Sequence, residues 1–217
     1  MKIQYNTEKL IIGIIPLLNG NGGNYVAVNM AYEYADIFKK QEKKIGLVNL
    51  RPNNDLAGNL IVKSNQDNEL ATHLKFGVDL INNITDKESF DRVRAIYDIL
   101  IVVLDFEQLD LFNSFAKKKT SILILKRNRN NLKKITENIQ KIKDSDIKYT
   151  IFNCPEKTNK ISFDILKDNN IANLANIPYN ELTVDNCDIE KSSKLEKIKN
   201  IKLFKKINCI KLTILKK

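Results

Sequence analysis

Near the start of this 217-residue chain, a short apolar run leads directly into a glycine-rich loop and then into a helical pattern. The run Leu10–Ile15 is continuously apolar, as expected of a buried strand. The helix predicted over about Tyr25–Lys40 carries an apolar stripe on one face, made by Ala27, Met30, Ala31, Tyr34 and Phe38. This order is typical of a phosphate-binding loop, in which backbone N–H groups and the helix N-terminus hold phosphates.

The loop lacks the charged and hydroxyl groups that usually complete such a site. A P-loop adds a lysine that reaches the β and γ phosphates and a Ser/Thr hydroxyl that binds Mg²⁺. Residues 16–24 contain no lysine, serine or threonine. Only the backbone part of a phosphate site is therefore predicted here.

The rest of the chain alternates between apolar runs and helical patterns up to about residue 177. Strands are predicted over Ile45–Leu50, Ile99–Leu104, Ser121–Leu125, Tyr149–Phe152 and Ala172–Ile177. Helices are predicted from Asp86 to Ile96, over Asn131–Lys143 and over Phe163–Lys167, whereas residues 56–84 show no clear pattern. This alternation predicts one α/β domain with a doubly wound, mainly parallel sheet and helices on both faces.

The loop and its helix resemble the ParA/MinD family, the deviant-Walker ATPases of the SIMIBI class, whose loop reads K-G-G-x-G-K-[ST]-T before a helix with A-x-N-L-A. The segment Ala27–Ala31 reads A-V-N-M-A and sets the register. By this register, Asn24 and Tyr25 stand where the family has its Ser/Thr pair. Gly23 replaces the P-loop lysine and Leu18 the second, signature lysine.

Two acidic motifs of the family are also altered. The family's D-x-D-P segment resembles Asn49–Pro52, in which Asn49 and Arg51 replace both aspartates. Its Y-D-x-x-[IV]-x-D segment resembles the stretch from Tyr97, but the metal-associated aspartate falls on Val103. Asp105 lies two residues further along, about 6.6 Å at about 3.3 Å per residue, which is too far for an unaltered Mg²⁺ site.

Two later segments match the family more closely. Tyr149–Asn153 resembles the strand whose terminal Asn contacts the adenine base, and Ile177–Asn180 resembles the I-P-x-[DN] turn. The resemblance covers about residues 8–185 and implies a P-loop NTPase-like fold, here in a degenerate member. If a nucleotide is retained, the resemblance implies that it contacts Gly20, Asn21, Gly22, Gly23, Asn24, Tyr25 and Asn153. We expect no catalytic residues, no metal ligands and no firmly held cofactor, with ATP or ADP as the alternative, because the cations that offset triphosphate charge are missing.

Most of the excess positive charge lies in the C-terminal segment. Residues 189–217 hold ten lysines and two glutamates, a net +8 of the +10 carried by the whole chain. We therefore predict an α/β domain over residues 1–188 and a basic segment over 189–217, which we expect to form a helix of the same domain. A strand at Cys209–Leu215 fits the pattern as well, and periodicity does not decide between them.

The basic segment predicts an acidic partner or a merely solvated face. Lysines opposite an apolar stripe, together with one off that pattern, form the candidate surface: Lys202, Lys205, Lys206 and Lys211. An anionic membrane surface would attract such an amphipathic helix, and DNA would attract it together with Lys117–Lys119 and Lys126–Arg129. In the bland alternative, the apolar face packs on the sheet.

Cysteines, the histidine and hydropathy exclude several other classes. Cys154, Cys187 and Cys209 are widely spaced without a C-x-x-C pair, and His73 is the only histidine, so neither a disulfide framework nor a zinc site is predicted. No apolar run reaches the roughly 18 residues of a membrane span, and the N-terminus lacks a signal-peptide pattern. We expect a cytoplasmic protein, with peripheral binding at the membrane or nucleoid as the variant.

Three functional hypotheses follow. The first is a ParA/MinD-like pseudo-ATPase that acts as a scaffold or positioning factor in partition, division-site placement or pilus and secretion placement, as a homodimer or beside an active paralogue. The second is an active partition-type ATPase that recruits replacement groups such as Asp105 or a lysine from elsewhere. Lys9 is not a good candidate for that lysine, because it precedes the first strand and so lies at the end opposite to the glycine loop. The third is a basic DNA-binding or membrane-binding module that has kept only the fold.

Overall fold

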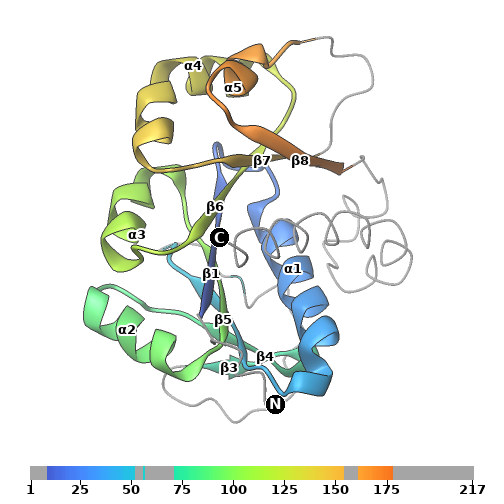
Figure 1. Cartoon of the computed structure of the whole chain (residues 1–217), viewed down its shortest axis with the longest axis vertical. Helices are drawn as coiled ribbons and strands as arrows, with labels where there is room; N and C mark the ends of the chain where they lie inside the picture. The colour runs from blue at the N-terminus through green and yellow to red at the C-terminus, as the bar shows by residue number, and fades with distance from the viewer. Residues whose placement is uncertain (1–8, 52–55, 57–70, 154–160, 178–217) are drawn as a thin grey trace, which may run out of the picture.

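The computed structural model of the chain describes residues 9–51, 56, 71–153 and 161–177, which build a central sheet with helices on both faces. The sheet has eight strands in the order β3-β4-β2-β5-β1-β6-β7-β8 (Figure 1). The strands are β1 (Leu10–Pro16), β2 (Ile45–Asn49), β3 (Thr72–His73), β4 (Val78–Ile81), β5 (Ile99–Val103), β6 (Thr120–Leu125), β7 (Tyr149–Asn153) and β8 (Ala172–Ile177). All pairs are parallel except β3 with β4.

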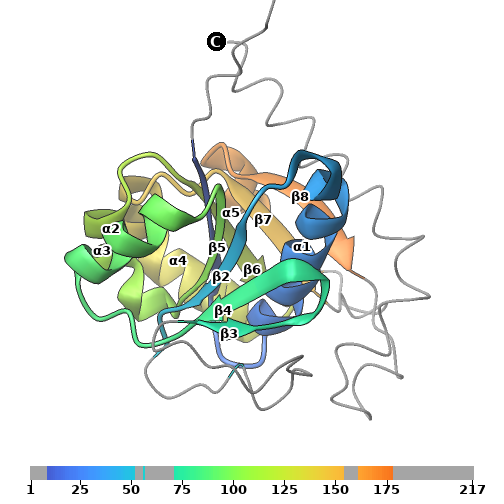
Figure 2. The same cartoon turned by 90° about the horizontal axis from the view of Figure 1, so that it is seen from below.

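Within the described residues, five helices cover the sheet, one on one face and four on the other. They are α1 (Gly23–Phe38), α2 (Lys87–Ile96), α3 (Leu109–Phe115), α4 (Arg129–Asp144) and α5 (Asp164–Asp168), with short 3₁₀ turns η1 (Lys39–Gln41), η3 (Lys75–Gly77) and η4 (Phe106–Gln108). In Figure 2, α1 lies on one side of the sheet and α2, α3 and α4 on the other. The predicted doubly wound α/β architecture is therefore confirmed.

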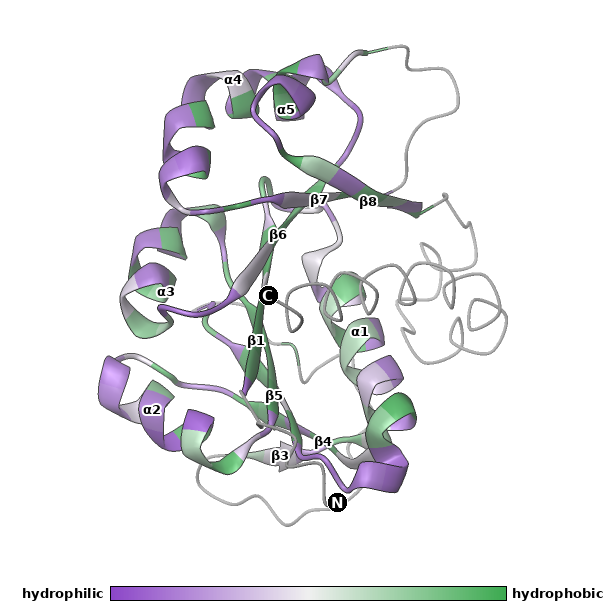
Figure 3. Cartoon of the chain, in the orientation of Figure 1, coloured by the Kyte–Doolittle hydropathy of each residue, from purple (hydrophilic) through white to green (hydrophobic). Residues whose placement is uncertain are grey.

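The sheet separates two apolar cores because successive side chains of a strand point to opposite faces. Ile12 and Ile14 of β1 pack with α1, which contributes Met30, whereas Ile15 lies in the core that contains Phe112 of α3. Figure 3 shows the central strands as predominantly hydrophobic and the helices as alternating between hydrophobic and hydrophilic positions. Strands buried on both faces explain why their sequences are continuously apolar.

Most predicted elements are found, with ends shifted by one or two residues. The strand predicted over Ala172–Ile177 matches β8 as predicted, and α2 begins directly after Asp86, whose side chain accepts a hydrogen bond from the Ser89 N–H. On α2, Phe90 and Val93 are buried, but Ile96 at the end of the helix is 51% exposed.

Two parts of the fold were not predicted. Helix α3 has seven residues, too few to show a helical period, and its Phe112 ring packs close to Gly13 of β1. Strands β3 and β4 lie within residues 56–84. Strand β4 is four residues long, and Asp79 interrupts its run of apolar residues. The predicted domain division at residue 188 and the whole basic segment 189–217 lie outside the described residues. Among the described helices, none is long and apolar enough to cross a membrane.

Parallel pairing places the carboxyl ends of the central strands side by side. The end of β1 leads into the glycine loop, the end of β2 into Arg51, the end of β5 into Asp105, and β7 ends at Asn153. Ligands of open α/β sheets bind at this carboxyl edge, beyond the strand ends. The candidate site therefore lies at the carboxyl edge of the sheet.

Candidate functional site

The glycine loop joins β1 to α1 and contains two glycines in left-handed conformations. Gly22 caps α1 with a left-handed conformation (φ 85°), and Gly20 is also left-handed (φ 78°). The Val26 N–H donates to the Gly22 carbonyl oxygen at 3.1 Å, which closes the first turn of α1. Glycine suits both positions because residues with a Cβ atom are strained there.

Three asparagine side chains hold this loop against its neighbours. The Asn21 side-chain amide donates to the Ile124 carbonyl oxygen at 3.1 Å and to Oδ1 of Asn131 at 2.7 Å. Asn153 donates from Nδ2 to the main-chain oxygen of Asn21 at 2.9 Å. All three asparagines are almost fully buried, at 2%, 1% and 6% exposure. The loop is thus tied to the ends of β6 and β7 and to the start of α4.

Asn153 is predicted to contact an adenine base, and the structure shows a second use for it. Its amide lies so close to the loop that a Cβ added to Gly22 would stand 2.0 Å from Nδ2 of Asn153. The side chain therefore fills space directly beside the loop backbone. Contact with a base stays a prediction, whereas the contact with the loop is observed.

The position of the missing P-loop lysine is closed by a proline. A Cβ built on Gly23 would lie 2.9 Å from both Cγ and Cδ of Pro16 at the end of β1. This is closer than side chains pack, so a lysine at position 23 would have to displace the Pro16 ring. The two residues fit each other and leave no room for the lysine that the family has here.

Arg51 contacts both the start of α1 and the turn after β5, and the sequence did not predict these contacts. Its Nη1 donates to Oδ1 of Asn24 at 2.6 Å, and its Nε lies 2.8 Å from Oδ1 of Asp105. The Nε–Asp105 contact is an ion pair whose N–H direction is not aligned for a hydrogen bond. Only 6% of the Arg51 side chain is exposed, against 33% for Asp105.

Burial lowers the pKa of the Arg51 guanidinium, and attraction to Asp105 opposes that effect. Arginine stays protonated in proteins because its ordinary pKa lies far above neutrality. Arg51 therefore brings a fixed positive charge to the site, which is matched by the Asp105 carboxylate. Residues 16–24 add no charge of their own.

Further hydrogen bonds fix the backbone on both sides of this ion pair. Oδ1 of Asn49 accepts from the Arg51 N–H at 3.2 Å, and Asn49 donates to Oδ1 of Asn82 at 3.2 Å. Gln108 donates from Nε2 to the Leu50 carbonyl oxygen at 2.6 Å and accepts from the Asp105 N–H at 2.9 Å. The turns after β2 and β5 are therefore joined directly.

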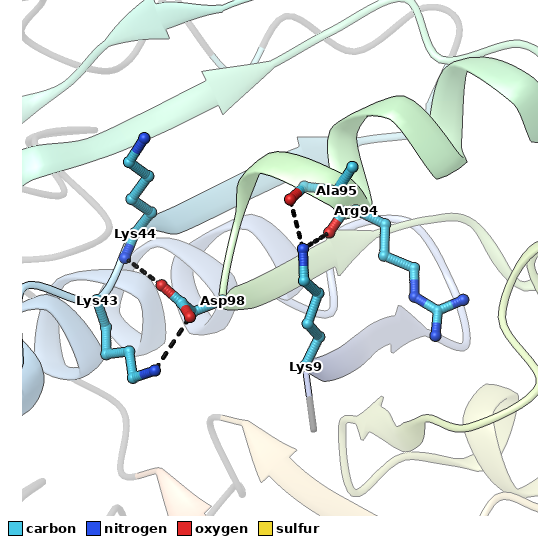
Figure 4. A network of polar contacts seen from close by, with 6 residues as sticks. All are labelled: Lys9, Lys43, Lys44, Arg94, Ala95 and Asp98. Atoms are coloured by element: carbon cyan, nitrogen blue, oxygen red, sulfur yellow. Dashed lines mark hydrogen bonds and ion pairs between the residues drawn. The ribbon is translucent and has the colours of Figure 1, made fainter. Parts of the chain in front are cut away.

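Lys9, weighed as a replacement for the lost lysine, lies at the opposite edge of the sheet. Figure 4 shows its Nζ at the end of α2, where it donates to the carbonyl oxygens of Arg94 and Ala95 at 2.6 and 2.5 Å. In the same figure, Asp98 accepts from Lys43 and from the Lys44 N–H, each at 3.0 Å. These cations stabilise the amino edge and do not reach the glycine loop.

Tyr25, which stands where the family has its second hydroxyl residue, is a core residue. Its ring packs against the apolar core beside α1, and its hydroxyl is buried with no partner among the described residues. The candidate lysines of the basic surface, Lys202, Lys205, Lys206 and Lys211, lie outside the described residues. Of the residues that sequence reasoning missed, Asn131 belongs to no motif. Gln108 forms a capping box with Asp105, and this D-x-x-Q spacing is the signal that could have found it.

The donor set at the carboxyl edge does not fit a triphosphate with Mg²⁺. In the register of the resemblance, Asn24 replaces the metal-binding hydroxyl, and its side-chain oxygen accepts from a guanidinium. Val103 replaces the metal-associated aspartate, and Asp105 is paired with Arg51. Throughout the described part of the chain, no three His, Cys, Asp or Glu side chains gather as a metal site would require. Magnesium prefers oxygen ligands in near-octahedral geometry, which this cluster does not offer.

Several solved structures share this architecture. A ParA family ATPase from Chlorobium tepidum TLS superposes with a TM-score of 0.70 at 14% identity, over 92% of this chain and 99% of that one. A plasmid partition protein from Borrelia burgdorferi B31, bound to AMPPNP, gives 0.63 at 16% identity over 92% and 99%. MinD from Aquifex aeolicus, solved in complex with MinC, gives 0.60 at 16% identity over 82% and 85%.

The chain has the ParA/MinD fold. The TM-scores of 0.60, 0.63 and 0.70 establish the ParA/MinD-like architecture. At identities of 14–16%, the similarity shows the fold and not the activity of these proteins. No protein-family model matches the sequence, and no curated protein does. The ParA/MinD-like fold thus agrees with the resemblance found in the sequence, including its order of strand, glycine loop and helix.

Proposed function

We propose that this chain is a ParA/MinD-like pseudo-ATPase, a non-hydrolysing scaffold or positioning factor in partition, division-site placement or the placement of pilus or secretion machinery. The observation that carries the proposal is the contact between the Arg51 guanidinium and Asn24 at 2.6 Å. A cation of the protein contacts the residue that stands, in the register of the resemblance, where the family has a metal-binding hydroxyl. Phosphoryl transfer depends almost entirely on positioned charge, and that charge is used internally here.

The closed space at Gly23 supports the same proposal. In a P-loop, the lysine is a point charge on the β and γ phosphates. Here the Pro16 ring fills the space beside the Gly23 backbone, 2.9 Å from where a Cβ would start. Lys9, weighed as a replacement for this lysine, is bound at the opposite edge of the sheet.

The alternative of an active ATPase requires Asp105 to serve the metal. Asp105 is paired with Arg51 at 2.8 Å, and its N–H is bonded to Gln108. Recruiting Asp105 would leave a buried arginine without its counter-charge, which costs several kcal/mol. The contacts observed at this edge therefore favour the non-hydrolysing reading.

The decisive experiment is phosphate release by the purified full chain with ATP and Mg²⁺, beside fluorescent-nucleotide titration with and without Mg²⁺. We expect no turnover above that of a Gly22→Ala variant, and no gain in nucleotide affinity on adding Mg²⁺. Sustained turnover that is lost in Gly22→Ala would overturn the proposal.

A restored loop tests whether the pocket itself persists. Gly23→Lys with Asn24→Thr returns the family residues, but the Pro16 ring obstructs the new side chain. We therefore expect nucleotide binding only when Pro16→Gly and Arg51→Asp are added to these two changes. Binding by the two-residue variant alone would show that the closed space at Gly23 is unimportant.

We propose that a scaffold of this kind works through a protein partner, as a homodimer or with a paralogue. The MinD of Aquifex aeolicus, with the same fold, was solved with a different protein, MinC. Light scattering on the full chain without nucleotide should then give a defined complex larger than 25.0 kDa, alone or with a paralogue added. A strictly monomeric chain that is indifferent to any paralogue would contradict this part.

DNA and membrane binding remain predictions for the basic segment 189–217. Of the other candidate cations, Lys119 donates to the Ala116 carbonyl oxygen and lies over the Phe112 ring, and Arg127 lies over the Phe152 ring. Those two are engaged within the protein. We propose a cytoplasmic protein. DNA binding is tested by electrophoretic shifts at about 50 and 200 mM salt, and membrane binding by liposome co-sedimentation. Both are measured with and without residues 200–217, which separates binding to DNA from binding to a membrane.

A further inference from the structure

We infer that Arg51 is a built-in substitute for a bound metal ion, which permanently fixes the turns after β2 and β5 to the start of α1. This inference rests on the proposed function in one respect: it takes Asn24 to hold the place of the relatives' metal-binding hydroxyl. What it adds is a consequence for conformation. The carboxyl edge would be set in one arrangement without any nucleotide.

Three segments that are far apart in the sequence meet on one side chain. Arg51 follows β2, Asn24 lies in the first turn of α1, and Asp105 follows β5. The guanidinium reaches Asn24 from Nη1 and Asp105 from Nε, at 2.6 and 2.8 Å. A planar fork with donors at fixed angles can join two acceptors in one geometry, which a flexible ammonium does not do equally well.

We call the contacts of Arg51 with Asn24 and Asp105 the Arg51 joint. Because Arg51 is buried, breaking this joint is costly. A cation removed from water is costly, and a carboxylate partner with good geometry is needed to offset that cost. Arg51 has 6% side-chain exposure, and its charge is offset by the Asp105 carboxylate at 2.8 Å, an ion pair without an aligned hydrogen bond, together with the hydrogen bond to Asn24. Surface ion pairs contribute little because water and salt screen them. Separating Arg51 from Asp105 would leave a buried charge without its counter-charge, and separating it from Asn24 would break a hydrogen bond of the buried guanidinium, so movement of any of the three segments is opposed.

Both partners of the ion pair are held in place before they meet. Asn49 accepts from the Arg51 N–H, and Gln108 accepts from the Asp105 N–H while donating to the Leu50 carbonyl oxygen. Hydrogen bonds that fix a ligating group in advance reduce the entropy lost when it binds. Arg51 and Asp105 are therefore preorganised for each other, as ligands around a metal ion usually are.

The covalent attachment of this cation distinguishes it from a metal. A metal ion with a nucleotide can dissociate, so contacts that depend on it can be switched. Arg51 is part of the chain and cannot leave, and its charge is independent of pH over the physiological range. The carboxyl edge then has no ligand-dependent second state, which suits a constant scaffold better than a cycling ATPase.

The test is hydrogen exchange of the full chain without nucleotide, in Arg51→Met and in a matched control, Lys43→Met. Lys43 also pairs with an aspartate, Asp98 at 3.0 Å, but at the amino edge and with 26% side-chain exposure. We expect Arg51→Met to speed exchange in residues 20–26 and 104–108 at least about tenfold and to lower Tm by about 10 °C. Lys43→Met should leave both segments unchanged and lower Tm by less than about 4 °C.

Two more variants separate a joint from a merely structural residue. Asn24→Ala removes the acceptor of the Arg51 hydrogen bond and no charge, and should speed exchange in residues 20–26 while leaving residues 104–108 protected. Arg51→Lys keeps the charge but not the fork, and should restore Tm in part without restoring protection of residues 20–26. If Arg51→Met does not fold, the Asn24→Ala result decides alone.

Unchanged exchange at residues 20–26 in both Arg51→Met and Asn24→Ala would overturn the inference, whatever happens to Tm. Because these measurements use no nucleotide, they are independent of ATP turnover. Turnover by the wild-type chain would refute the proposed function, and the inference about Arg51 would then be judged by hydrogen exchange alone. Absence of turnover together with unchanged exchange would refute the inference about Arg51 and leave the proposed function standing.

Discussion

The two edges of the sheet use polar residues in opposite ways. Of the eight buried polar or charged side chains among the described residues, five lie at the carboxyl edge: Asn21, Asn49, Arg51, Asn131 and Asn153. At the amino edge, the polar cluster of Figure 4 is largely exposed, with Lys43 and Asp98 at 26% and 32%. One edge thus encloses its polar groups within the protein and the other offers them to water.

The difference matters because the carboxyl edge is where sheets of this type bind ligands. A binding edge would present polar groups toward an open space. Here the side chains of Asn21, Asn131 and Asn153 bond to one another and to the loop, and Arg51 bonds to Asp105 and Asn24. Polar residues at a ligand-binding edge can therefore serve the fold instead of a ligand.

The largest effect expected from the comparison concerns the two left-handed glycines of the loop. Gly22→Ala adds a strained φ and a clash with Asn153 at 2.0 Å, and should destabilise the protein by about 3 kcal/mol. Gly20→Ala has the same strain but open space around it, and should cost about 1 kcal/mol. Urea unfolding measures both, and equal losses would show that Asn153 is not packed against the loop.

A smaller effect is expected from the asparagine tether. Asn131→Leu removes the acceptor for the buried Asn21 amide and should cost about 2 kcal/mol. The control, Gln140→Leu, removes an exposed hydrogen bond to Asp144 and should change the free energy of unfolding by less than about 0.5 kcal/mol. If the two variants were equally stable by urea unfolding, the two edges would not differ in the way described.

At the amino edge, removing a cation should matter less. Lys9→Met deletes the amine that binds the last carbonyl oxygens of α2, and should cost at most about 1 kcal/mol. Lys148→Met, which breaks an exposed pair with Asp146, is the control and should be nearly neutral. A loss for Lys9→Met as large as that for Asn131→Leu would contradict the contrast between the edges.

The smallest effect is a pH dependence at the amino edge. Burial alone would raise the pKa of Asp98, but hydrogen bonds from the Lys44 N–H and from Lys43, with the attraction of Lys43 and Lys9, outweigh it and hold the pKa below its usual range. A lowered pKa in the folded state gives stability that is present above the unfolded pKa, about 3.9, and is lost as pH falls below it.

Asp98→Asn should therefore be less stable than wild type at pH 7 and should approach it near pH 3. Unfolding in urea at the two pH values measures the difference. A stability gap that stays constant between pH 7 and pH 3 would show that the Asp98 charge contributes nothing.

Prediction from the sequence succeeded where an element is long or continuously apolar. Strand β5 reads I-L-I-V-V and is wholly buried, and α1 and α4 each have sixteen residues, enough to show an apolar stripe. Helix α3, with seven residues, and the strands β3 and β4, with two and four, were missed because elements this short do not define a period. Length, more than composition, limited what could be predicted.

For the site, the sequence indicated which groups are absent and could not indicate which contacts replace them. Gly23 and Asn24 were recognised by counting from Ala27–Ala31, a local comparison. The contact of Arg51 with Asp105 joins residues that are 54 positions apart and depends on strands β2 and β5 being neighbours. Asn131 reaches Asn21 over 110 positions and belongs to no motif.

The sequence by itself determined the strand, loop and helix order, the apolar strands and the loss of lysine and hydroxyl groups from the glycine loop, because these follow from local periodicity and residue chemistry. Only the tertiary structure decided that Pro16 closes the lysine position and that Arg51, Asn24 and Asp105 meet. Parallel pairing brings the carboxyl ends of distant strands together, and the contacts made there depend on that pairing rather than on any neighbourhood in the chain.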